Sequence, residues 1–325
     1  MQIEKKFKPF YKWSGGKSKE FTKVTDWMPS SYDTYYEPFL GGGAIWLGLA
    51  PEKCVVGDFY DEVSNFFMVL KKHGNVFIDE CNEISKDYNE KIKQNLKGLQ
   101  DVKIDEKSKE MKKYSTGKSK EDLKKDPKYQ KIKEELKSLR ALAKKEFSDN
   151  SKIFYDWRNK TPIDDKDKAK RFFVLRCLAY GGMLRFNSDG KFNVPYGYYK
   201  SFKSLIYPKG IDILLNSTTI LNDDWKQTVS TAKTNDFCFF DPPYTREFKE
   251  YSSGNVFGNK QHIELADYFK SKKSKCMIII NKDDFTYELY KDYIKEEYVF
   301  NYSTKYRDRL SKEDNEVIHF VACNY

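Results

Sequence analysis

The sequence predicts an α/β fold with a mostly parallel sheet, and three stretches carry this prediction. Residues 237–240 (Phe-Cys-Phe-Phe) are an apolar, β-prone run that two prolines end, as expected of a buried strand. Residues 35–47 place a short aromatic strand before a glycine-rich turn and a helix. Residues 54–58 (Cys-Val-Val-Gly-Asp) follow as a second short strand that ends in an acid. This order of elements indicates a nucleotide-type binding half.

Length and charge narrow the class of protein. A chain of 325 residues can bury the core of one large domain or two modest ones. The net charge of +10 favours a polyanionic partner, above all nucleic acid, although an AT-biased genome would give a similar composition. No apolar run approaches the ~20 residues of a membrane span. We therefore expect a soluble, cytoplasmic protein.

Cysteine and histidine usage argues against metal or disulfide chemistry. The six cysteines are widely spaced without a CxxC pair, which is typical of reduced core residues in a cytosolic protein. The three histidines have no metal-ligand spacing. We expect no metal site.

Residues 241–244 (Asp-Pro-Pro-Tyr) follow the strand at 237–240 and form the first candidate site. The carboxyl ends of strands are where α/β sheets bind ligands. A carboxylate, a backbone carbonyl freed by the prolines and an aromatic ring suit a planar heterocycle with an exocyclic amine, which has two hydrogens to donate. The alternative is an ordinary turn with an exposed tyrosine.

Two glycine-containing loops are candidate cofactor contacts. Residues 13–17 (Trp-Ser-Gly-Gly-Lys) precede a helix-like stretch, whose first N–H groups would favour a carboxylate. They do not form a phosphate-binding GxxxxGK[ST] loop, and a flexible N-terminal turn is the alternative. In the second loop, Asp58 follows Gly41 by 17 residues, near the offset at which an acid usually binds a ribose diol.

Residues 86–150 differ in composition from the rest of the chain. They contain 20 Lys and Arg against 13 Asp and Glu, a net charge of +7. Apolar spacing predicts a helical hairpin from about 120 to 147, whereas 103–119 is expected to be disordered. We interpret the segment as an insertion into the α/β core. It is either a solvated arm without function or an element that binds DNA or a partner.

Residues 185–194 predict a β-hairpin around the Asp189-Gly190 turn. Arginine and asparagine side chains read guanine and adenine edges, and a two-stranded ribbon fits the major groove. In the alternative reading the arginine of a purely structural hairpin pairs with a core acid. Further along the chain, 211–221, 276–281 and 316–323 predict core strands, and 261–272 predicts a helix.

Four motifs, in this order, resemble those of the Dam-type DNA adenine-N6 methyltransferases: 13–17, 37–43, 185–197 and 241–244. The resemblance spans nearly the whole chain except about 86–165. It implies a Rossmann-like, S-adenosylmethionine-dependent methyltransferase sheet with an inserted helical and hairpin target-recognition domain. Residues 1–70 and 206–325 would form the catalytic domain, and 71–205 the recognition region.

The resemblance also implies residue roles. The flipped-out adenine would be held by Asp241, Pro242, Pro243 and Tyr244. The cofactor would be bound by Trp13, Gly15, Gly16, Lys17, Glu37, Pro38, Phe39, Gly41, Gly43, Asp58, Asp224 and Trp225. Among these, Lys17 would lie at the methionine end, Asp58 at the ribose and Asp224 at the cofactor's adenine, where Trp225 replaces the family's phenylalanine. DNA would be bound by Arg185, Asn187, Lys191, Asn193, Pro195 and Tyr196.

We therefore expect a site-specific DNA methyltransferase that transfers a methyl group from S-adenosylmethionine to the N6 amine of adenine in double-stranded DNA. A cognate restriction endonuclease is a candidate partner, and GATC is the first target to test. Asp241 and the Pro242 carbonyl would accept the two amine hydrogens and draw the nitrogen toward tetrahedral geometry. The alternatives are a cytosine-N4 or RNA adenine methyltransferase, and a non-catalytic nucleic-acid-binding protein on the same fold.

Overall fold

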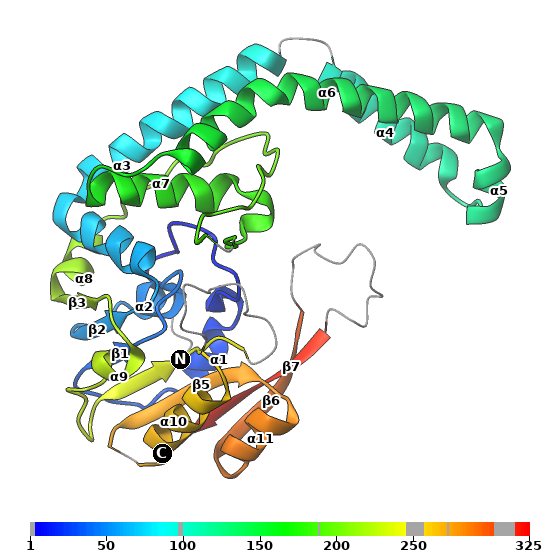
Figure 1. The fold of residues 1–325 in the computed structure, drawn as a ribbon. Coiled ribbons are helices and arrows are strands. Elements are labelled where there is room, and N and C mark those ends of the chain that lie inside the picture. Colours follow the sequence, from blue (N-terminus) through cyan, green and yellow to red (C-terminus); the bar gives the residue numbers. More distant parts are fainter. Residues whose placement is uncertain (1–3, 97–99, 188, 245–256, 272, 302–315) are drawn as a thin grey trace.

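The computed structural model describes residues 4–96, 100–187, 189–244, 257–271, 273–301 and 316–325. Its centre is a seven-stranded sheet in the order β3-β2-β1-β4-β5-β7-β6 (Figure 1). Strands β1 to β5 pair in parallel, and β7 runs antiparallel between β5 and β6. The strands are β1 (Tyr35–Glu37), β2 (Cys54–Gly57), β3 (Thr218–Leu221), β4 (Phe237–Phe240), β5 (Lys275–Asn281), β6 (Ile294–Asn301) and β7 (Glu316–Cys323). The predicted α/β fold class and mostly parallel sheet are confirmed.

Helices cover both faces of this sheet because successive strand side chains point to opposite sides. In β4, Phe237 and Phe239 join one core cluster, whereas Cys238 and Phe240 join the other. The first cluster contains apolar residues of α1 (Phe21–Trp27), α2 (Ala44–Leu49), α3 (Asp61–Leu96), α7 (Asp165–Leu178) and α8 (Ile211–Ser217). The second contains residues of α9 (Trp225–Thr228), α10 (Asn259–Lys270) and α11 (Asp284–Tyr290). Two short 3-10 helices, η1 (Lys17–Lys19) and η3 (Lys291–Tyr293), flank α1 and α11, and a third, η2 (Tyr180–Gly182), follows α7.

A helical arm projects from this body. Figure 1 shows α4 (Gln100–Ser115) alongside the first part of α6 (Pro127–Asn159), with α5 (Lys120–Lys125) at the far end. The second part of α6 packs on the body through contacts with α3 and α7, and its Phe154 is fully buried. Helix α3 leads from the body into the arm and bends at Gly74, whose φ is 55°. The predicted boundary at residue 70 therefore falls inside one helix.

Two predictions for the arm were wrong. Residues 103–119 are not disordered as a whole, because α4 extends to Ser115. Residues 120–147 do not form a helical hairpin, because α6 continues as one helix from Pro127 to Asn159 and pairs with α4. Ile132 and Leu136 of α6 are buried, so the apolar spacing reflects one face of one long helix.

The strand predicted at 211–221 was also wrong over its first part. Ile211–Ser217 is a helix, α8, and only Thr218–Leu221 forms a strand. Ile211, Leu214 and Leu215 are buried at helical spacing, and Gly210 starts the helix with a φ of 84°. The apolar residues of 211–221 cross a boundary between a helix and a strand, so their spacing follows neither the helical nor the strand period throughout.

Among the described residues, all six cysteines are free thiols, and five of them are buried. No described helix is long and apolar enough to cross a membrane.

Candidate active site

Three carboxyl groups lie at the carboxyl ends of neighbouring parallel strands. Glu37 ends β1, Asp58 follows β2 and Asp241 follows β4. The chain leaves β1 for β2 on one side and reaches β4 on the other, so this is the topological switch point at which α/β sheets bind ligands. The structure thus brings together the predicted acids from three separate motifs.

Burial raises the pKa values of all three acids. The pKa of Glu37 rises to about 8, and the nearby charges of Asp241 and Asp58 add to the effect of burial. The pKa of Asp58 and that of Asp241 each rise to about 6, again mainly through burial. Burial and the repulsion between these acids both disfavour three ionised carboxylates, so the site favours a ligand that carries positive charge.

Lys17 makes an ion pair with the predicted catalytic acid. Its ammonium lies 2.6 Å from Asp241 Oδ1 and donates hydrogen bonds to the Tyr244 hydroxyl (2.9 Å) and the Gly15 carbonyl (3.2 Å). The Lys17 side chain is only 2% exposed, so its end of the pair is shielded from water. Lys17 opposes the effect of burial on the pKa of Asp241. The family resemblance implies that Lys17 lies at the methionine end of the cofactor, and the structure shows that it also contacts the Asp-Pro-Pro-Tyr turn.

The other two acids shape the loops around them. Asp58 accepts hydrogen bonds from the backbone N–H groups of Gly41 (2.8 Å) and Tyr60 (2.9 Å). Glu37 accepts one from the Tyr35 hydroxyl (2.6 Å) and one from the Trp46 N–H in the first turn of α2 (2.8 Å), both at Oε2. Asp58 therefore holds the glycine-rich turn, and Glu37 holds the start of α2, the helix that follows this turn.

The glycine-rich turn lies directly against the indole of Trp13. A Cβ atom on Gly41 would lie 2.4 Å from Trp13 Nε1, and one on Gly42 would lie 2.9 Å from Trp13 Cβ. The Tyr11 hydroxyl donates to the Gly41 carbonyl (2.8 Å), and the Arg176 guanidinium stacks 4.9 Å from the Trp13 ring centre. The motifs at 13–17 and 37–43 are thus one structural unit.

We expect Gly41→Ala to lower the free energy of unfolding by about 1–3 kcal/mol, because the new methyl group overlaps Trp13 and the φ of +48° disfavours alanine. Gly210→Ala is the matched control, since its φ is +84° but no atom lies within 4 Å of the added Cβ. Urea unfolding of both variants measures the difference. An equal loss in the two variants would mean that Trp13 moves aside without cost.

A second, unpredicted network lies behind Lys17. Glu20 Oε1 lies 2.7 Å from His319 Nδ1 and accepts a hydrogen bond from the Tyr298 hydroxyl (2.5 Å), and Glu20 Oε2 lies 3.8 Å from Lys17 Nζ. His319 also lies edge-on to the Tyr244 ring at 5.4 Å. His319 and Tyr298 come from the far end of the chain, and the only signal for this network in the sequence was Glu20, an acid three residues after Lys17.

Two predicted contact residues are already packed into the core. Tyr244 is 7% exposed, so a base that stacks on it must replace atoms that now cover the ring. Trp225 is 3% exposed and packs against Phe240 and Tyr268, so little of its indole is accessible from the surface. Asp224 is exposed and caps α9 through a hydrogen bond from the Lys226 N–H (2.9 Å).

The predicted hairpin is present in a short form, with one bridge between Phe186 and Phe192. Arg185 Nε donates to the Asn193 side-chain oxygen (2.8 Å), so among the residues that the structure describes the arginine pairs with the opposite strand and not with a core acid. The Asn187 side-chain oxygen accepts from the backbone N–H groups of Asp189 (3.1 Å) and Lys191 (2.8 Å), which holds the turn.

The end of the motif at 185–197 packs against α3. Tyr196 is 1% exposed, and its hydroxyl bonds to that of Tyr88 in α3. A direct DNA contact would require a surface position, so the burial of Tyr196 argues against its predicted role, and its hydroxyl instead contacts Tyr88 of α3. Pro195 is exposed, and its carbonyl accepts from the Tyr180 N–H (2.9 Å).

The Asp-Pro-Pro-Tyr turn and the glycine-rich loop both lie at the switch point of the sheet. The model of the D12 class N6 adenine-specific DNA methyltransferases matches residues 13–306, and the chain belongs to this family. The match includes the arm as well as the motifs. The protein is an adenine-specific DNA methyltransferase.

Individual relatives agree with this assignment. The chain is 32% identical over 323 residues to the type II methyltransferase M.CviBI of Paramecium bursaria Chlorella virus NC1A, with 98% of this chain and 100% of the relative covered. It is 27% identical to the type II methyltransferase M1.LlaDCHI of Lactococcus lactis subsp. cremoris (88% and 85% covered). It is 25% identical to a DNA adenine methylase of Haemophilus influenzae (88% and 83% covered).

Proposed function

We propose that the methyl donor is S-adenosylmethionine and that it binds at the switch point between β1 and β4. The observation that carries this proposal is the group of three acids with raised pKa values, Glu37, Asp58 and Asp241. Such a site suits a ligand with a cationic amine and a sulfonium. When bound, this cofactor supplies an electrophilic methyl group. Glu37 and Gly41 would hold its amino-acid and ribose portions, and Asp58 the ribose hydroxyls.

The target adenine would leave the duplex and enter the Asp-Pro-Pro-Tyr turn. Enzymes that modify a base flip it out of the stack, since its reactive atom is inaccessible within the duplex. Asp241 would accept one amine hydrogen and the Pro242 carbonyl the other, which localises the nitrogen lone pair for attack. The Lys17 ammonium contacts Asp241 Oδ1, so the second carboxylate oxygen, Oδ2, would accept the amine hydrogen.

Incubation with methyl-labelled S-adenosylmethionine and a mixed-sequence duplex, followed by nucleoside analysis, tests this proposal. N6-methyladenine is the expected product. N4-methylcytosine, or methylation of RNA alone, would contradict the assignment of the base in the turn.

We also propose that the recognition region comprises 71–205, between the catalytic parts 1–70 and 206–325, and that the enzyme protects DNA against a cognate restriction endonuclease. The type II names of M.CviBI and M1.LlaDCHI support this second point. Mapping of methylated adenines in DNA from cells that express the protein identifies the recognition sequence.

Arg185→Ala is expected to flatten the preference among target sequences. Arg185 and Asn193 are held together on the hairpin, so they would meet a base pair as one unit. A bidentate base contact is worth ~1–3 kcal/mol of discrimination, which corresponds to a loss of roughly 5- to 150-fold in site preference. Lys203→Ala is the control, because Lys203 is an exposed lysine outside the hairpin and the variant removes one positive charge without changing the Arg185–Asn193 pair. An unchanged methylation profile for Arg185→Ala would place recognition elsewhere.

A further inference from the structure

The positive charge of the arm is concentrated at its far end. We define the arm tip as residues 111–131, which comprise the end of α4, the turn, α5 and the start of α6. The tip contains eight lysines and three acids, a net charge of +5, which is half the charge of the whole chain. The adjoining shaft segments, 101–110 and 132–140, contain six basic and six acidic residues. If the arm were only a solvated projection, there would be no reason for the positive charge to lie at the tip and not along the shaft.

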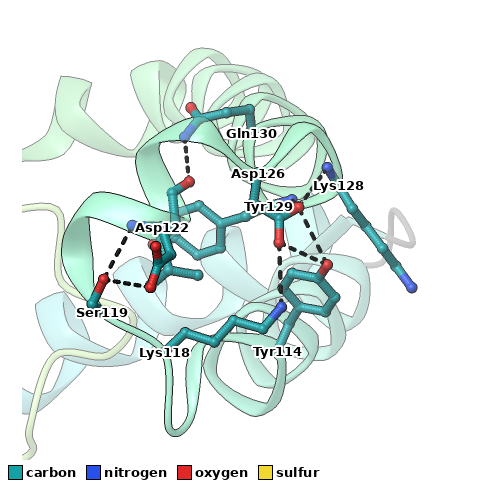
Figure 2. Close-up of polar contacts among 9 residues, drawn as sticks. Tyr114, Lys118, Ser119, Asp122, Asp126, Lys128, Tyr129 and Gln130 are labelled. Atoms are coloured by element: carbon teal, nitrogen blue, oxygen red, sulfur yellow. Dashed lines mark hydrogen bonds and ion pairs between the residues drawn. The ribbon is translucent and has the colours of Figure 1, made fainter.

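Two of the three tip acids hold the tip together, as Figure 2 shows. Asp126 caps α6 by accepting from the N–H groups of Lys128 (2.9 Å) and Tyr129 (3.1 Å). Its other oxygen accepts from the Tyr114 hydroxyl (2.9 Å) and pairs with Lys118 (3.2 Å). Ser119 caps α5 through the Asp122 N–H (3.1 Å) and donates to the Asp122 carboxylate (2.7 Å). The turn therefore has a fixed shape.

The lysines are left on the outside of this turn. Lys112, Lys113, Lys124 and Lys125 are exposed, and within the described part of the chain they make no ion pair. By contrast, shaft lysines are partly neutralised: Lys107 pairs with Glu110 (2.9 Å) and Glu135 (2.6 Å), and Lys109 with Asp105 (3.0 Å). The tip presents ammonium groups on a rigid support, which suits a row of phosphates.

We propose that the arm tip binds phosphates of the same DNA duplex outside the target site, and this inference rests on the proposed function. At ~1.5 Å per residue, α4 is roughly 24 Å long, and only the first part of α6 lies beside it because the second part packs on the body. At about 3.4 Å per base pair, the tip reaches on the order of 7 base pairs from the body. Phosphate contacts carry no sequence information, so the tip adds affinity and not specificity.

An acidic protein would also match the charge of the tip. DNA is favoured because a duplex held at the active site is already tethered to the same molecule, which raises its effective concentration at the tip. A protein partner has no comparable tether.

The experiment compares two duplexes with the same target, one with about 5 flanking base pairs on each side and one with about 20, the lengths following from the reach of the arm. The tip variant changes Lys112, Lys113, Lys124 and Lys125 to Gln. The shaft variant changes Lys103, Lys109, Lys133 and Lys137 to Gln, which removes the same charge from the same arm. All eight side chains are exposed, and circular dichroism checks that both variants keep the helical arm.

We expect the wild type to bind the long duplex more tightly. The tip variant should lose roughly tenfold in affinity for the long duplex, with a shallower salt dependence, and change little on the short one. The shaft variant should retain the advantage of the long duplex. Equal weakening by both variants, equal weakening on both duplexes, or no effect of the tip variant would each overturn the inference. Loss of methyl transfer to both duplexes by the wild type would instead contradict the proposed function.

Discussion

Asp241→Asn is expected to lower the rate of methyl transfer by about 10²- to 10³-fold, which corresponds to roughly 2.7–4 kcal/mol of transition-state stabilisation. The substitution keeps the shape of the side chain but removes the charge that accepts an amine hydrogen and stabilises the positive charge developing on the nitrogen. Single-turnover kinetics with saturating DNA and methyl donor measure this step. Because Asp241 is 20% exposed and lies after β4, outside its hydrogen-bonded ladder, we expect the fold to remain intact.

Duplex binding is the control for this variant. Asn keeps an oxygen that accepts hydrogen bonds, so binding should change by less than the rate does. Equal transfer by the wild type and Asp241→Asn, at background level, with retained duplex binding, would favour the non-catalytic binding protein.

Lys17→Met is expected to move the acid limb of the pH–rate profile to higher pH. Transfer requires Asp241 as a carboxylate, so the wild-type rate should be full well above a pH of about 6 and fall as the pH drops through this value. Loss of the Lys17 ammonium removes the interaction that opposes burial, and the pKa of Asp241 then rises further. Near neutral pH, more of the variant is protonated and its rate is lower.

The matched control is Lys19→Met. Lys19 lies in the same helical turn and its side chain is exposed, so the variant loses the same charge without loss of the ion pair to Asp241. Rates are measured from about pH 5 to about pH 9, because this range includes the pKa of Asp241 at about 6. The midpoints of the two profiles separate the variants. A Lys17→Met profile with the wild-type midpoint but a uniformly lower rate would mean that Lys17 binds substrate and does not set the charge of Asp241.

Most of the parallel core of the sheet was predictable, because β1, β2, β4 and β5 each carry a local signal in the sequence. The run at Phe237–Phe240 is buried on both faces, so it is continuously apolar, and the glycine turn after β1 marks a strand–helix junction. Strand β6 was missed although its burial alternates along Ile294–Asn301. The apolar residues do not follow this alternation, because Val299 is exposed whereas the charged Glu296 is half-buried, and an edge strand therefore shows only a weak apolar pattern.

The order of the motifs was enough to indicate the family, but not the contacts between them. Local sequence determined the Asp-Pro-Pro-Tyr turn and the glycine turn, since the conformation of a turn depends on residues that are adjacent in the chain. The concentration of lysines in 86–150 is likewise visible in the sequence alone. Only the tertiary structure decided that Lys17 meets Asp241 and that Glu20 meets His319, because these pairs are separated by more than 200 residues. It likewise decided that Trp225 and Tyr196 are packed in the interior. An aromatic side chain suits a core as well as a ligand, and only the neighbours that folding brings to it settle which role it takes.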